Sequence, residues 1–117
     1  MARRAALVAT TLVVLATAVL LTPAASGSSS AKYTVRAVDF RFRNMPARVP
    51  AGVHTFTVVN RGQATHDLRL AGKKTRLLNP GQRASIKVRL KKGRTYAYVC
   101  TIIGHAALGM KGKLRVR

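Results

Sequence analysis

From Lys32 to the C-terminus, the sequence alternates between apolar and polar residues in short segments that are separated by turn residues. In the clearest segment, residues 84–90, alanine, isoleucine, valine and leucine occupy every second position, with serine, lysine and arginine between them. A period of two places one row of side chains on the buried face of a strand and the other row in solvent. A long amphipathic helix needs a period of about 3.6 residues, and no run from Ala31 onward has that pattern.

Segments of this kind predict seven or eight short β-strands. We expect strands at residues 32–38, 39–43, 54–60, 66–70, 75–78, 84–90, 94–100 and 114–117. Turn signals separate them at Pro50-Ala51-Gly52, Arg61-Gly62-Gln63, Gly72-Lys73-Lys74, Asn79-Pro80-Gly81 and Lys92-Gly93. Strands that recur about every 8–12 residues are typical of an all-β sandwich or a small barrel.

The N-terminal segment follows a different pattern. A positive start with Arg3 and Arg4 is followed by an uncharged apolar run over residues 5–21 and then by the small residues of 22–25. This is the order of a secretory signal peptide, which is cleaved after small residues. We therefore predict that residues 1–25 are a signal peptide that is removed at its end.

A retained membrane anchor is the alternative interpretation of the same apolar run. Its 17 residues lie at the short end of the about 17–25 residues that cross a bilayer as a helix. In both cases, a flexible spacer over residues 26–31 joins the run to one folded domain over residues 32–117. The folded domain is then exported, to the periplasm, the extracellular space or the cell surface.

Charge and cysteine content exclude several classes of function. The chain has 22 Lys and Arg residues but only two carboxylates, Asp39 and Asp67, and its formal net charge is +20. Paired-carboxylate glycosidase chemistry and carboxylate-rich Ca²⁺ or Mg²⁺ sites are therefore not expected. The single cysteine, Cys100, excludes a disulfide framework and a structural zinc site built on several thiolates.

Four side chains form a candidate metal site. Cys100, His105 and Met110 are spaced as C-x4-H-x4-M, and His66 starts an earlier predicted strand after a Gly-containing turn. Two imidazoles and one thiolate in a plane, with a long axial thioether, are the donor set of blue-copper electron-transfer sites. Thiolate and thioether favour Cu(I) and imidazole suits Cu(II), so a rigid site of this composition changes little during one-electron transfer. We predict one copper ion here. Met45, beside Pro46, is expected to pack in a loop and is the next candidate for the axial position only if Met110 is not at the metal.

These residues belong to two segments that resemble the cupredoxins, the blue type 1 copper proteins such as plastocyanin, azurin and auracyanin. The segments are A-G-V-H-T-F-T-V-V-N-R-G-Q-A-T-H-D-L and T-Y-A-Y-V-C-T-I-I-G-H-A-A-L-G-M-K-G-K-L-R-V. The resemblance covers essentially residues 32–117. It implies a Greek-key β-sandwich and a copper ion held by the four candidate ligands.

The resemblance also implies roles for neighbouring residues. The residue after the first histidine ligand is commonly Asn in the family and is Asp67 here, and its backbone bridges toward the cysteine sulfur. The change to a carboxylate alters the local charge and hence the copper potential. The family further implies that His105 lies near the surface in a small apolar patch through which electrons pass, and Ala106, Ala107 and Leu108 fit this patch.

Two classes of function fit the sequence best. The first is a one-electron carrier, not an enzyme, which docks as a monomer with an acidic or membrane-associated redox partner. The second is a copper storage or delivery protein, but such proteins more often use exposed Met and His clusters, which this sequence lacks.

A third possibility uses the positive charge directly. A basic module braced by copper would bind anionic lipid or cell-wall polyanions. Nucleic acid is not an expected partner, because export removes the chain from the genome and the basic residues do not form one stripe.

Overall fold

The computed structural model describes residues 2–21 and 29–117. Residues 2–21 contain no helix or strand and are exposed, and no helix within the described residues is long and apolar enough to cross a membrane. The predicted cleavage point at Ala25 and the first half of the predicted spacer, residues 26–28, lie outside the described residues. Within the described part, Ser29 is the first residue to pair with a sheet, through a bridge to Gly52.

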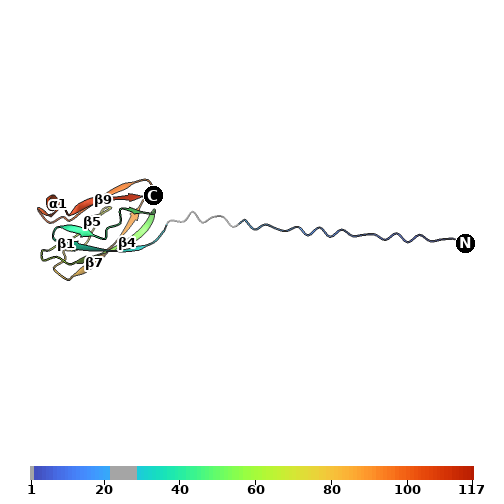
Figure 1. Ribbon diagram of the computed structural model, residues 1–117, viewed down its shortest axis with the longest axis horizontal. Helices are drawn as coiled ribbons and strands as arrows, with labels where there is room; N and C mark the ends of the chain where they lie inside the picture. Colours follow the sequence, from blue (N-terminus) through green and yellow to red (C-terminus); the bar gives the residue numbers. More distant parts are fainter. Residues whose placement is uncertain (1, 22–28) are drawn as a thin grey trace.

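Two β-sheets form a two-layered sandwich (Figure 1). The first sheet has the order β2 (Arg41–Arg43), β1 (Lys32–Val38), β4 (Gly52–Asn60) and β7 (Arg83–Leu90). The second has the order β3 (Arg48–Val49), β9 (Lys111–Val116), β8 (Thr95–Val99), β5 (Arg69–Leu70) and β6 (Lys73–Lys74). The described residues thus confirm the predicted all-β sandwich, with nine strands where the sequence predicts seven or eight.

The predicted alternation builds the core between the sheets. Along β7, Ile86, Val88 and Leu90 are buried, and the residues between them are exposed. Leu114 and Val116 on β9 supply the facing layer from the other sheet. Full burial of such a side chain stabilises the fold by about 1.5–3 kcal/mol. The same period that predicts the strands therefore also accounts for the core.

The predicted turn at Gly72-Lys73-Lys74 is wrong in its position. The turn consists of Ala71 and Gly72, which have φ angles of 50° and 77°, and it joins β5 to β6. Tight two-residue hairpin turns of this kind need positive φ at both central residues. The two lysines therefore lie on β6 and pair with β5.

The predicted strands at residues 66–70 and 75–78 are also corrected. Only Arg69–Leu70 of the first segment is a strand, and residues 75–78 belong to none. Their remaining pairing is an isolated antiparallel bridge between His66 and Leu78. The segment that carries His66 is therefore positioned by individual hydrogen bonds and not by a continuous ladder.

The fully buried His54 on β4 has a structural role. Its Nδ1 accepts the N–H of Ala31 at 3.1 Å, and its Nε2 donates to the carbonyl of Pro50 at 2.7 Å. Both ring nitrogens are therefore used in joining the start of β1 and the turn before β4 to the sheet.

Candidate metal centre

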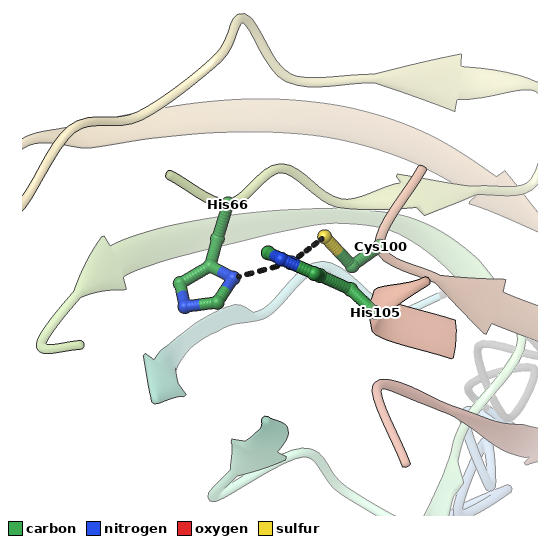
Figure 2. Close-up of side chains that lie close together, drawn as sticks. All are labelled: His66, Cys100 and His105. Atoms are coloured by element: carbon green, nitrogen blue, oxygen red, sulfur yellow. Dashed lines mark hydrogen bonds between the residues drawn. The ribbon is translucent and has the colours of Figure 1, made fainter. Parts of the chain in front are cut away.

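Three metal-ligating side chains from distant parts of the sequence meet at one place (Figure 2). His66 precedes β5, Cys100 follows β8, and His105 begins the short helix α1 (His105–Leu108). The Nδ1 atoms of the two histidines lie 3.2 Å apart, and the Cys100 Sγ lies 3.6 Å from the His105 Nδ1. All three ligand atoms lie within 4.8 Å of one another. The fold thus brings together the three residues that the sequence predicts as the planar donor set.

The loop between β8 and β9 carries Cys100, His105 and Met110. The N–H of Cys100 donates to the carbonyl of Met110 at 3.0 Å, and the N–H of Met110 donates to the carbonyl of His105 at 3.1 Å. Gly104 enters α1 with a φ of 85°, a left-handed conformation that few other residues adopt. Met110 is fully buried where the loop closes, whereas Met45 is half-buried and packs against the hydrophobic core.

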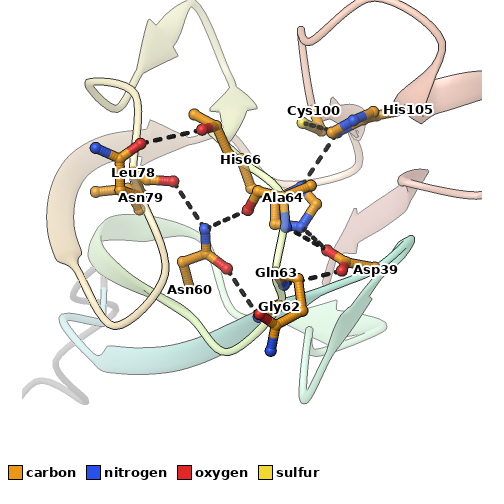
Figure 3. A network of polar contacts seen from close by, with 11 residues as sticks. Asp39, Asn60, Gly62, Gln63, Ala64, His66, Leu78, Asn79, Cys100 and His105 are labelled. Atoms are coloured by element: carbon orange, nitrogen blue, oxygen red, sulfur yellow. Dashed lines mark hydrogen bonds and ion pairs between the residues drawn. The ribbon is translucent and has the colours of Figure 1, made fainter.

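The end of β4 holds the segment that carries His66 (Figure 3). The backbones of His66 and Leu78 exchange two hydrogen bonds of 3.0 and 2.8 Å. The buried Asn60 donates from its Nδ2 to the carbonyls of Ala64 at 2.8 Å and Leu78 at 2.7 Å. No sequence pattern points to Asn60, whose amide group joins the carbonyl of Ala64, just before His66, to that of Leu78, which pairs with His66.

Asp67 joins the two ligand-bearing segments through its side chain. Its carboxylate accepts the backbone N–H of Thr101 at 2.6 Å and also the Thr101 hydroxyl. Thr101 directly follows Cys100, so the fully buried Asp67 fixes the chain next to the cysteine. Burial raises the pKa of the Cys100 thiol, so binding of a metal cation must displace its proton.

Asp39 contacts the outer nitrogen of His66 (Figure 3). The Asp39 Oδ1 lies 2.6 Å from the His66 Nε2. The carboxylate also accepts the backbone N–H groups of Gln63 at 2.8 Å and Ala64 at 3.3 Å. The bond from Gln63 contributes most to lowering the pKa of Asp39. No motif or spacing places Asp39 at the site. The one hint in the sequence is that the chain has only one other Asp or Glu residue, Asp67.

The ring of Phe40 covers both imidazoles. Its centroid lies 6.2 Å from that of His66 and 4.9 Å from that of His105, with the rings edge to face. His66 is fully buried and His105 is half-buried. Burial lowers the pKa of His105, and the neighbouring His66 lowers it further. The neutral imidazole, which is the form that binds metals, is therefore favoured at His105.

The helical turn at His105 presents an apolar surface. Of the three predicted patch residues, Ala106 is half-buried and Ala107 and Leu108 are exposed. Ile103, two residues before His105 in the same loop, is 98 % exposed and is a further apolar residue that the sequence pattern did not point to.

The donor set fits copper. The Nδ1 atoms of the two histidines and the Cys100 sulfur face one another, and a thioether is available on the same loop. Such soft and borderline donors suit copper, whereas Mg²⁺ and Ca²⁺ need oxygen ligands. Both carboxylates at the site are already engaged, Asp39 with His66 and Asp67 with Thr101.

Comparison with known proteins identifies the family. Residues 53–117, more than half of the chain, match the profile of the copper-binding proteins of the plastocyanin/azurin family. The chain belongs to this family, and its cofactor is one type 1 copper ion. None of the curated proteins matches the chain.

Solved structures share the fold. A Na-dithionite-reduced auracyanin from the photosynthetic bacterium Roseiflexus castenholzii has a TM-score of 0.66 at 20 % identity, over 78 % of this chain and 99 % of that chain. Auracyanin A, a "blue" copper protein from Chloroflexus aurantiacus, has a TM-score of 0.63 at 18 % identity, over 76 % of this chain and 100 % of that chain. A blue copper oxidase from Nitrosomonas europaea aligns with a TM-score of 0.64 at 15 % identity, over 76 % of this chain and only 39 % of that chain. These likenesses confirm the predicted cupredoxin-like fold.

Proposed function

We propose that this protein is an exported carrier of single electrons whose copper ion is held by His66, Cys100, His105 and Met110. The observation that carries the proposal is the convergence of two imidazole nitrogens and the cysteine sulfur within 4.8 Å. Membership of the plastocyanin/azurin family and the auracyanin-like fold support it. The copper ion, when bound, supplies the Cu(II)/Cu(I) couple.

The chain contributes a site that holds its donor atoms still. Backbone hydrogen bonds close the loop from Cys100 to Met110. The Asp67 carboxylate joins this loop to the His66 segment by accepting hydrogen bonds from Thr101. A site that is held in this way resists rearrangement when the charge at its centre changes. Three of the four proposed ligands are buried, which opposes release of the copper ion. This favours a carrier over a storage or delivery protein.

The surface supports docking with an acidic or membrane-associated redox partner. His105 is the half-buried ligand, and the exposed side chains of Ala107 and Leu108 beside it carry no charge. A partner can therefore approach this ligand without displacing charged groups. The strongly basic remainder of the chain would attract an acidic partner over a longer range.

Replacing Met110 tests the ligand assignment. We expect the copper-loaded Met110→Gln protein to keep its blue colour but to have a lower reduction potential, because an amide oxygen favours Cu(II) more than a thioether does. Voltammetry measures this potential. Met45→Gln is the matched control and should leave the potential unchanged. A shift of the reduction potential in the Met45 variant alone would show that Met45, and not Met110, is the axial ligand.

Export is tested by the N-terminus of the protein isolated from cells. The positive start, the apolar run and the small residues predict that mass spectrometry finds a mature N-terminus between about Ala24 and Ala31. An intact segment of residues 2–21 in the membrane fraction would support the anchored form instead. An intact chain in the cytoplasm would contradict export.

A further inference from the structure

The chain has 22 basic residues and only two carboxylates, yet both carboxylates lie at the candidate metal centre. Asp67 links the ligand-bearing segments, whereas Asp39 contacts a ligand side chain directly. We propose that Asp39 is a positioning residue, which holds His66 in the form and orientation that bind copper and thereby favours Cu(II) over Cu(I). This inference rests on the proposed role of His66 as a copper ligand.

The contact selects one form of the His66 ring. An ionised carboxylate can only accept hydrogen bonds, so the His66 Nε2, 2.6 Å from Asp39 Oδ1, carries the proton and donates it. A neutral imidazole has one N–H, so the proton on Nε2 leaves the lone pair on Nδ1. The His66 Nδ1 is the atom that faces the His105 Nδ1 at 3.2 Å. Asp39 therefore directs the free lone pair of His66 toward the other donor atoms.

Asp39 is itself fixed in place. Its two oxygens accept the backbone N–H groups of Gln63 and Ala64, in the loop that leads to His66. Gly62 allows the close approach, because a Cβ atom at this position would collide with the Asp39 Oδ1 and would lie 2.9 Å from the His66 Nε2. The carboxylate therefore positions the ring relative to its own loop.

The expected effect on the metal follows from charge. A carboxylate that accepts the outer N–H of a histidine ligand makes the ring a stronger donor, and loss of such a partner typically costs about 10–100-fold in metal affinity. A stronger nitrogen donor and a nearby negative charge both stabilise Cu(II) more than Cu(I). The His66 ring is fully buried and the Asp39 side chain is 25 % exposed, so water screens this interaction only in part.

The main test compares two substitutions that change the net charge equally. Asp39→Asn removes the negative charge from the contact, and Gln63→Lys adds one positive charge on the same loop while the Asp39–His66 contact remains. We expect Asp39→Asn to weaken Cu(II) binding relative to Cu(I) about tenfold, which raises a one-electron potential by about 59 mV. Gln63→Lys should shift the potential much less. Equal shifts in the two variants, or no shift in Asp39→Asn, would overturn the proposal.

Two further measurements complete the test. The first uses a second variant, in case Asp39→Asn does not fold, and the second needs no copper. Gly62→Ala keeps every charge but displaces the carboxylate, so it should raise the potential in the same direction even if Asp39→Asn does not fold. NMR of the copper-free protein at pH 8 should show the His66 proton on Nε2 in the wild type and a mixture of tautomers in Asp39→Ala. In a wild type that binds copper, a proton on Nδ1 would overturn the Asp39 proposal alone. A wild type that binds no copper would overturn the proposed function and, with it, the preference for Cu(II) assigned to Asp39.

Discussion

Replacing Cys100 with serine is expected to remove the intense visible absorption of the copper-loaded protein. In a blue copper site this absorption arises from charge transfer between the cysteine thiolate and Cu(II). Serine offers a harder oxygen donor with no comparable transition, and it is close to cysteine in size. The backbone hydrogen bond from the Cys100 N–H to the Met110 carbonyl does not involve the sulfur, so the loop should keep its shape.

The absorption spectrum, taken together with copper analysis and far-UV circular dichroism, measures this effect. Thr101→Val is a suitable control, because it alters the hydroxyl bond to Asp67 next to the cysteine but leaves the sulfur in place. The control should retain the blue band. A folded Cys100→Ser protein that remains blue would refute the assignment of the copper site.

The second large effect concerns ionic strength. The net charge falls only from +20 to about +18 if Arg3 and Arg4 are removed with the signal peptide. Basic residues on the strands are exposed as predicted, and so is Arg117 directly after β9: the strand residues are Arg36, Arg41, Arg43, Lys87, Arg89 and Arg115. Electrostatic steering of this kind raises association rates by about 10–10³-fold. Salt shortens the Debye length from about 10 Å at 0.1 M to about 3 Å at 1 M, so this gain is lost at high salt.

We therefore expect the second-order rate constant for electron transfer to a negatively charged acceptor to fall at least about tenfold between low and high salt. Stopped-flow measurements of the oxidation of the reduced protein give this constant. An uncharged acceptor is the control and should react at a rate that depends little on salt. A flat profile with the anionic acceptor would mean that docking depends on the apolar surface around His105, and that the basic residues bind another partner such as a cell-wall polyanion.

The parts of the fold that the sequence predicts well are those with a regular local pattern. Alternation identifies β1 and β7, because both strands bury one face against the core. The two-residue β3 has too few positions to show a period, and the sequence analysis missed it. The two-residue strands β5 and β6 were misplaced for the same reason, and their positions depend on the positive φ angles of Ala71 and Gly72.

The candidate site likewise has a part that the sequence predicts and a part that it does not. Cys100, His105 and Met110 lie within one short loop, so their spacing alone points to a common metal. The contact between Asp39 and His66 joins residues 27 positions apart and depends on how two loops meet. No periodicity or motif records such a contact, and the structure was needed to find it.

A reductive titration of the copper-loaded protein tests the central claim most directly. The visible band and the bound copper are followed while electrons are added in the presence of a Cu(I) chelator, and the protein is then reoxidised. A carrier should take up one electron per copper, lose its band, keep its copper, and recover the full band on reoxidation. Transfer of the copper to the chelator upon reduction, or a copper-loaded protein that shows no blue band, would contradict the account.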